Sequence, residues 1–314
     1  MRYIKGVTFG WGYHKGDWFK EETYTSIDKM VKRTGCDTII LPLIALQEHT
    51  NSTTVYRSSQ DHEDIPTREE AERVISYCKK IGLHVILKCV VNCLDGYWRA
   101  NINFFPHDII CEPTWKEWFE SYSTYVTDIA ELAQKHNVEM LIVGCEMVCS
   151  DVREKEWRTL ISDVRSIYKG LVTYNCDKYQ ENYISWWDAC DCISSSGYYP
   201  VGSWRVELKR IQEVTEHYRL PFFFAEAGCP SRTKSQYRPN DWSLNGSPDE
   251  DAQASYYEEM FATCKEAGFV NGFGLWDWKA NLYPLESHAV DDDYAIYGKK
   301  AEQLIHACYT EQLD

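Results

Sequence analysis

Two glutamates stand where apolar runs of the chain end. Glu146 follows the run 140–145, and Glu226 follows the run 222–225. A carboxylate at the end of a buried segment costs free energy unless it is paired, hydrogen-bonded or neutralised. Two carboxyl groups facing each other across a cleft are what hydrolysis of a glycosidic bond requires, because one protonates the leaving oxygen while the other attacks or stabilises the anomeric carbon. The plainer alternative is that each glutamate forms an ion pair with a neighbouring loop.

The segments that carry these glutamates belong to a regular alternation of strand-like and helix-like stretches. The strand-like runs are continuously apolar, which is typical of parallel strands covered on both faces. Eight such runs, each followed by a helical stretch, predict a single α/β domain over residues 1–314, a (β/α)8 TIM barrel. A doubly wound open sheet is the second choice, because no Gly-x-Gly-x-x-Gly follows the first strand. The predicted strands are 5–11, 36–47, 84–92, 138–146, 170–177, 190–200, 220–230 and 270–279.

Helix-start signals support the same alternation. Thr67 and Glu70 have the spacing of a capping box ahead of apolar residues at helical intervals. Ser247, Pro248 and Glu250 predict an N-cap, a first helical position and a capping glutamate for a helix that runs to about residue 267. The longest predicted helix covers 114–137. The remaining ones cover 22–34, 154–169, 203–219 and 295–309.

A barrel of this kind places the two glutamates opposite each other. Its active site lies at the carboxyl ends of the strands. Glu146 ends the fourth predicted strand and Glu226 the seventh, 80 residues further on. That separation corresponds to three βα units of about 27 residues, and strands three apart in a ring of eight face each other. We therefore expect the two carboxyl groups to meet at the barrel mouth, about 5–5.5 Å apart if the configuration is retained.

Aromatic and polar side chains gather at the same predicted rim. Sugar rings stack on aromatic faces, so these residues are candidates for binding substrate, although some aromatic rings at such positions only close the barrel. Lys88 is a candidate for contacting sugar hydroxyls or for balancing a buried glutamate. Glu48, Asp95 and Asp177 are expected to orient loops or to face solvent. The predicted substrate-binding residues are Trp11, Lys88, Asn92, Trp98, Arg99, Tyr198, Tyr199, Trp276 and Asp277.

Composition limits the partners. The chain has 33 Lys and Arg against 48 Asp and Glu, a formal net charge of −15, which disfavours nucleic acid and anionic membranes. No apolar run approaches the roughly 20 residues that span a bilayer, and the N-terminal segment lacks a signal-peptide core. The 13 cysteines fit neither a disulfide framework nor a zinc-ligand spacing. We expect reduced thiols, a cytoplasmic location, no metal and no cofactor.

Several ordered motifs give the chain a family resemblance. It resembles glycoside hydrolase family 113, the β-mannanases, within the large clan of retaining (β/α)8 glycosidases. The similarity covers nearly the whole chain in the right order. The segments that carry it are Asp95-Gly96-Tyr97-Trp98-Arg99, Trp118-Phe119-x-x-Tyr122, Val143-Gly144-Cys145-Glu146, Gly197-Tyr198-Tyr199-Pro200 and Phe224-Ala225-Glu226-Ala227-Gly228.

The resemblance implies specific roles. Glu146 would be the general acid/base, Glu226 the nucleophile, one of the two tyrosines at 198–199 a hydrogen-bond donor to the nucleophile, and Trp276 the floor beneath the attacked sugar. The implied substrate is β-1,4-linked mannose, and the expected cytoplasmic location favours short oligosaccharides over polymer. One departure is Cys145, where the wider clan usually has Asn before the acid/base. Alternatives are another β-linked sugar, a carbohydrate-binding barrel without catalysis and, last, a metal-dependent hydrolase, since paired His ligands are missing.

Overall fold

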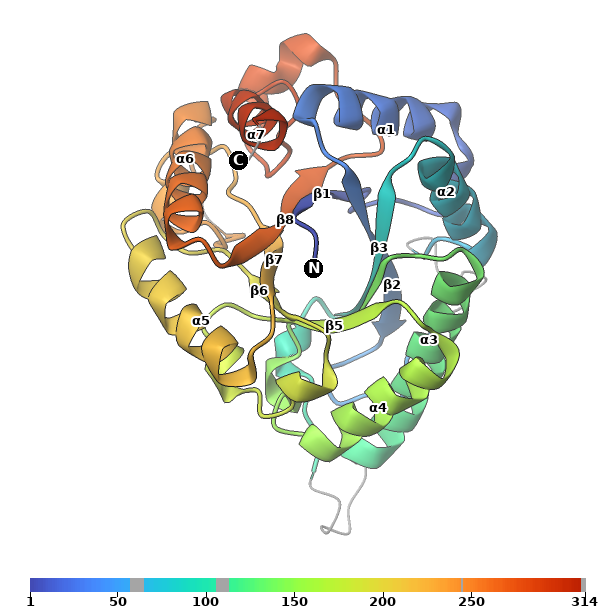
Figure 1. The fold of residues 1–314 in the computed structure, drawn as a ribbon. Coiled ribbons are helices and arrows are strands. Elements are labelled where there is room, and N and C mark those ends of the chain that lie inside the picture. The colour runs from blue at the N-terminus through green and yellow to red at the C-terminus, as the bar shows by residue number, and fades with distance from the viewer. Residues whose placement is uncertain (57–64, 106–112, 244, 312–314) are drawn as a thin grey trace.

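Eight parallel strands close into a barrel in the computed structural model, which describes residues 1–56, 65–105, 113–243 and 245–311 (Figure 1). Each strand pairs with its neighbours in sequence, and β1 pairs with β8 to close the ring. The predicted TIM barrel is therefore confirmed. The strands are β1 (Ile4–Phe9), β2 (Thr38–Gln47), β3 (His84–Cys93), β4 (Met140–Cys145), β5 (Leu171–Cys176), β6 (Ile193–Ser196), β7 (Phe222–Ala227) and β8 (Val270–Trp278).

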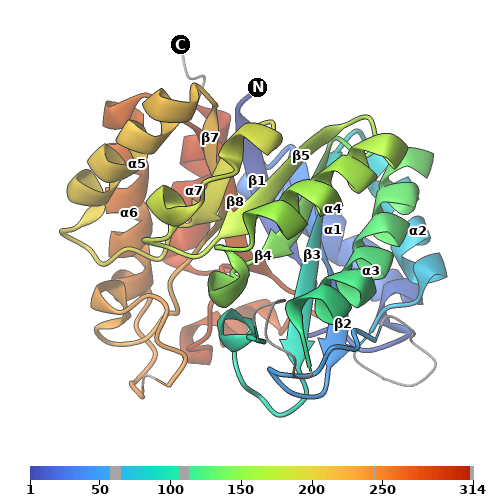
Figure 2. The same ribbon diagram turned by 90° about the horizontal axis from the view of Figure 1, so that it is seen from below.

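Helices cover the outside of the barrel and run alongside the strands (Figure 2). An α-helix follows every strand except β5, after which the described chain forms only two 3-10 turns, Glu181–Tyr183 and Trp187–Ala189. The helices are α1 (Glu21–Thr34), α2 (Arg68–Lys80), α3 (Trp115–Lys135), α4 (Glu154–Ile167), α5 (Trp204–Tyr218), α6 (Glu250–Ala267) and α7 (Lys300–Thr310). Within the described ranges, none of them is long and apolar enough to cross a membrane.

Helix starts follow the sequence signals with one exception. Thr67 and Glu70 form the predicted capping box at the start of α2. The predicted N-cap of α6, Ser247, is wrong, because the Asp249 side chain accepts the first helical N–H groups instead. Residues 247–249 are held in an extended path by backbone hydrogen bonds to Ser231 and Thr233, so the helix begins after them.

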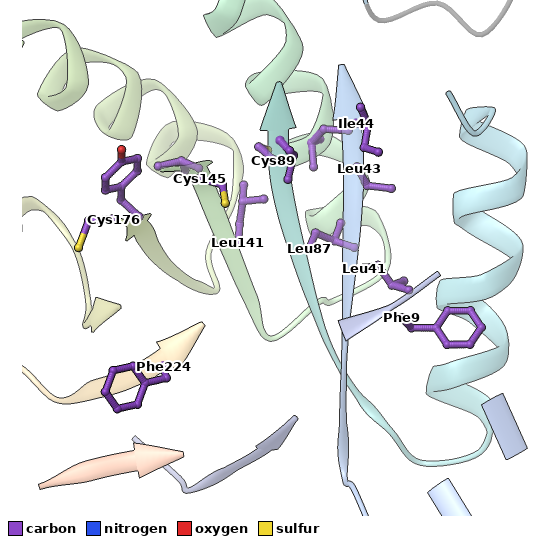
Figure 3. Packing of buried hydrophobic residues seen from close by; sticks show 14 of the residues in the cluster. Phe9, Leu41, Leu43, Ile44, Leu87, Cys89, Leu141, Cys145, Cys176 and Phe224 are labelled. Atoms are coloured by element: carbon purple, nitrogen blue, oxygen red, sulfur yellow. The ribbon is translucent and has the colours of Figure 1, made fainter. Parts of the chain in front are cut away.

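Apolar side chains fill two concentric layers. Alternate strand residues point outward and pack against the helices, as Leu41, Leu87 and Phe224 do in Figure 3. The residues between them point into the barrel and fill the end at which the strands begin. The interior is therefore a packed core and not a channel. The inward-facing cluster is Ile4, Ile40, Ile86, Met140, Ile142, Cys192, Phe223 and Ala225.

Cysteines are used as small apolar residues throughout these layers. All twelve cysteines in the described ranges are free thiols, and ten of them are buried. Of these twelve, Cys149 and Cys308 are partly exposed. Burial raises the thiol pKa, to about 12 for Cys36 and Cys192 for example, so these groups stay protonated and unreactive.

Candidate active site

A β-bulge turns Glu226 into the barrel mouth. In β7, Phe223 and Ala225 face the interior, so strict alternation would send the next residue outward. The register with β6 shifts at this point: Ser195 pairs with Phe224, and Ser196 pairs with Glu226. The extra residue re-aims the strand end, which is a common use of bulges beside active sites.

Three donors surround the Glu226 carboxylate. Lys88 Nζ lies 2.8 Å from Oε1, and the Cys145 thiol donates to the same oxygen at 3.4 Å. The Tyr198 hydroxyl donates to Oε2 at 3.1 Å. Between these contacts the carboxylate is held in one orientation with only 5% of the residue exposed.

Lys88 supplies the positive charge that balances Glu226. It is fully buried, and its ammonium also donates to Asn175 Oδ1 and to the Ala225 carbonyl, each at 2.9 Å. All three of its protons therefore have acceptors. Of the two roles considered for Lys88, the structure places it as the counter-charge of a buried glutamate, beneath the pocket.

Glu146 occupies the opposite side of the mouth. Its backbone has a φ of 54°, in the left-handed region, and its amide donates to the Asn175 carbonyl at 2.8 Å. Ser196 donates to Oε1 at 2.7 Å, whereas Oε2 faces the Trp98 indole N–H at 3.4 Å and the Arg99 guanidinium at 3.6 Å. A positive φ is uncommon for a residue with a side chain, so the surrounding contacts hold this strand end in place.

The surroundings shift the pKa values of the two carboxyl groups in opposite directions. Burial, and next the negative charge of Glu226, raise the pKa of Glu146 above its ordinary value, against the opposing effects of Arg99 and Ser196. Burial also acts on Glu226, but the charge and hydrogen bond of Lys88 outweigh it and lower the pKa of that carboxyl. The pair is therefore poised with Glu146 protonated and Glu226 ionised.

One oxygen of each carboxyl group and the Cys145 sulfur lie within 4.8 Å of one another. Such a group could in principle ligate a metal ion. Here the Lys88 ammonium already occupies one carboxylate, and burial followed by the charge of Glu226 holds the pKa of the Cys145 thiol well above its usual range. The donor set therefore suits an acid–base pair better than a cation site.

The two glutamates open into a pocket of about 640 Å³ at the carboxyl ends of the strands. Six predicted substrate-binding residues line it: Trp11, Asn92, Trp98, Arg99, Tyr198 and Trp276. Trp11 and Trp276 lie with their ring centroids 5.0 Å apart on one side. The remaining lining residues are Cys93, Gly96, Tyr97, Glu146, Asp177, Lys178, Glu226, Asn240 and Trp242.

Comparison with known proteins agrees with this geometry. The model of Glycoside Hydrolase Family 113 matches residues 7–299. The chain belongs to glycoside hydrolase family 113. The resemblance seen in the sequence is thus confirmed, and the chain is a glycoside hydrolase. The comparison with curated proteins gives no match.

Solved GH113 structures are closely similar to the chain. A GH113 β-1,4-mannanase, solved as a complex, shares 48% identity with a TM-score of 0.97, covering 99% of this chain and 100% of the other. The GH113 β-mannanase AaManA from Alicyclobacillus acidocaldarius, in complex with ManMIm, shares 36% identity with a TM-score of 0.94, covering 98% and 97%. A β-glucuronidase from Ruminococcus gnavus, at 14% identity, TM-score 0.65 and 98% of this chain against 50% of its own, shares the fold alone.

Three of the nine predicted binding residues do not line this GH113 pocket: Lys88, which lies beneath it, and Tyr199 and Asp277. Tyr199 is fully buried and donates to Glu181 at 2.7 Å, on the outer side of the barrel. Asp277 is also fully buried, 2.8 Å from the Lys279 ammonium. Both were placed at the rim from their position near a strand end, but each side chain points away from the mouth.

Conversely, the pocket includes residues that the sequence reasoning did not select. Asp177, expected to orient a loop or face solvent, lines the pocket beside Lys178. Asn240 and Trp242 come from the long segment after β7, which has no strand pattern to anticipate its path. The sequence signal for Asp177 is its position near a strand end, which it shares with Asp277.

Proposed function

We propose that the chain is a retaining glycoside hydrolase that cleaves β-1,4-linked mannose oligosaccharides by double displacement. The observation that carries the proposal is the pair of buried carboxyl groups with opposed ionisation. Their nearest oxygens lie within 4.8 Å, which suits the spacing of about 5–5.5 Å found in retaining enzymes and not the 6.5–9.5 Å that leaves room for water in inverting ones.

In the first step, the ionised Glu226 attacks the anomeric carbon while Glu146 gives its proton to the departing oxygen. Lys88 and Tyr198 each donate to one oxygen of the attacking carboxylate and so fix its orientation. Trp276 and Trp11 offer aromatic surface to the sugar ring that carries this carbon.

In the second step, Glu146 acts as a base toward water. Once Glu226 is esterified to the sugar, its negative charge is gone, and that charge was one cause of the raised pKa of Glu146. The pKa of Glu146 therefore falls at the stage where a base is needed. Water attacks the glycosyl ester, the sugar leaves with retained configuration, and both carboxyl groups return to their first state.

The mannose specificity rests on the relatives. Both GH113 relatives described above are named β-mannanases, at 48% and 36% identity over nearly the whole chain. We further propose that short oligosaccharides are better substrates than polymer and that the chain works in the cytoplasm, a reducing compartment that suits its free thiols. Faster hydrolysis of long mannan than of mannotriose would contradict the first of these.

A panel of aryl β-glycosides and β-1,4-linked oligosaccharides tests the proposal, with wild type beside Glu146→Ala and Glu226→Ala. We expect hydrolysis of mannosides, with β-configured product seen first by NMR. Both variants should lose turnover of the oligosaccharides with an unchanged circular dichroism spectrum. Hydrolysis of another sugar alone would overturn the substrate but keep the mechanism. Tight sugar binding with no hydrolysis would overturn the enzymatic proposal itself.

A further inference from the structure

Asp177 has no evident role in holding the fold. It follows β5 directly, lines the pocket, and is only 7% exposed. In the described part of the chain its one ion pair is with Lys178, at 3.7 Å, which is too long for a hydrogen bond. Its acidic neighbour Glu181 instead pairs with Arg210 at 2.8 Å and accepts a hydrogen bond from Tyr199 at 2.7 Å. Within the described residues, Lys178 alone favours the ionised form of Asp177, through its ammonium and its backbone N–H. A nearly buried carboxylate with so few partners costs free energy unless a ligand supplies further donors.

The position of Asp177 relative to the catalytic pair indicates which part of a substrate it meets. β5 is the neighbour of β4, whose end carries Glu146. Burial, and next the charge of Glu146, raise the pKa of Asp177 to about 7, as expected for two neighbouring carboxyl groups. Asp177 is therefore on the acid/base side of the mouth.

The leaving group must lie on that same side. Glu226, with Lys88 and Tyr198 around it, defines where the attacked anomeric carbon sits. The glycosidic oxygen must reach Glu146 to be protonated. The sugar attached through that oxygen continues past Glu146, and the lining residues that follow β5 are Asp177 and Lys178.

The two side chains form a complementary pair for a sugar. A carboxylate accepts hydrogen bonds from two neighbouring hydroxyl groups, and an ammonium donates to a third oxygen. The Lys178 side chain is 13% exposed, and its ammonium lies 5.9 Å from the centre of the Tyr179 ring, so it is held near the pocket. Resting on the proposed function, we propose that Asp177 and Lys178 bind the hydroxyls of the first sugar in the leaving group and select for a pyranose there.

Two substrates with the same glycosyl part separate this role from others. In mannotriose cleaved to mannobiose and mannose, the leaving group is a sugar. In 4-nitrophenyl β-mannobioside it is a phenolate without sugar hydroxyls. For Asp177→Asn we expect kcat/KM on mannotriose to fall about 10- to 100-fold, mainly through KM, and to stay within about threefold on the aryl substrate, since a hydrogen bond to a charged group carries that much discrimination.

Matched variants keep the result interpretable. Asp188→Asn removes an exposed carboxylate from the segment that joins β5 to β6, where it pairs with Arg158, and we expect it to leave both substrates unaffected. Lys178→Met tests the second half of the pair and lies at a partly exposed position, so it serves if Asp177→Asn folds poorly. We expect it to reproduce the loss on mannotriose alone.

The outcomes are distinct. Equal losses on both substrates, or a pH profile of kcat/KM that moves while KM does not, would show that Asp177 acts through Glu146 or through the fold and would overturn the inference. Unchanged kinetics on mannotriose in both variants would overturn it as well. If wild type hydrolyses neither substrate, the proposed function itself fails, and this inference fails with it.

Discussion

Replacing Lys88 by Met isolates the contribution of the buried counter-charge to both stability and chemistry. Coulomb's law with an effective dielectric constant of about 20 gives about 6 kcal/mol for unit charges at the 2.8 Å that separates Lys88 from Glu226. Desolvation offsets part of this, and breaking one partner of a buried pair costs about 3–5 kcal/mol. Met fills a similar volume, so the loss is mainly electrostatic.

The loss of about 3–5 kcal/mol corresponds to a change in melting temperature. With about 2.1 cal/mol/K per residue, 314 residues give an unfolding entropy of about 0.7 kcal/mol/K, so Lys88→Met should lower Tm by about 5–8 °C at neutral pH. Because the pKa of Glu226 is lowered in the folded chain, the stabilisation is present above the ordinary value of 4.5 and is lost as pH falls through the folded value. The Tm difference between wild type and variant should therefore narrow in acid.

The kinetic consequence has a definite sign. Glu226 must be ionised to attack, so its protonation sets the acid limb of kcat/KM. If about 3 kcal/mol of the loss falls on the ionised carboxylate, its pKa rises by about two units in Lys88→Met. We expect the acid limb of kcat/KM to move to higher pH by that amount, measured on 4-nitrophenyl β-mannobioside across pH 3–9. The apparent pKa values read from this profile belong to the coupled pair of carboxyl groups.

Lys79→Met is the matched control. Lys79 and Glu139 are closer than Lys88 and Glu226, at 2.6 Å, but their side chains are 30% and 32% exposed. An exposed pair contributes only about 0–1 kcal/mol, so Tm should fall by less than about 2 °C with no change in the pH profile. If Lys88→Met lowered Tm no more than this control, or left the acid limb in place, burial of the counter-charge would not be what ionises the nucleophile.

Three further predictions concern neighbouring groups. Ser196→Ala removes a hydrogen bond to Glu146 that favours its charged form, so the pKa of Glu146 should rise and the alkaline limb of kcat/KM should move up by about 0.7 unit, for about 1 kcal/mol; a downward shift would contradict this. Glu146→Ala should cleave the aryl mannobioside only slowly and be rescued by azide to give a β-configured glycosyl azide by NMR, whereas an α-azide would refute double displacement. In Gly144→Ala, the new Cβ would lie 2.8 Å from the Trp157 ring, so overpacking should lower Tm by about 2–4 °C in a thermal melt, and an unchanged Tm would show that the ring has room to move.

The barrel and its catalytic pair were predictable because both depend on patterns that the chain repeats. Continuous apolar runs gave parallel strands, and a single carboxylate at the end of two of them pointed to the mouth. What the sequence could not supply was the direction of individual side chains near strand ends. Tyr198 and Tyr199 are adjacent, and only the backbone path after Ser196 decides that one faces Glu226 and the other faces Glu181.

β-Bulges are a second reason why the direction of side chains near strand ends could not be predicted from the sequence. The register shifts at the end of β4 and within β7 each insert a residue, and a one-residue shift exchanges the inward and outward faces. Asp177 and Asp277 have the same position in the sequence pattern, yet one lines the pocket and the other is buried against Lys279. Their positions near a strand end make the two residues equivalent in the sequence, but their local contacts in the structure differ.

The distribution of free thiols gives the chain a set of built-in reporters for local opening. Among the twelve cysteines that the structure describes, Cys149 and Cys308 are partly exposed and should react quickly with a thiol reagent, whereas each buried thiol should react only when its own element opens. Quantifying modification site by site by mass spectrometry would then rank the opening free energies around the ring without any engineered probe. The buried reporters are Cys36, Cys78, Cys89, Cys93, Cys145, Cys176, Cys190, Cys192, Cys229 and Cys264.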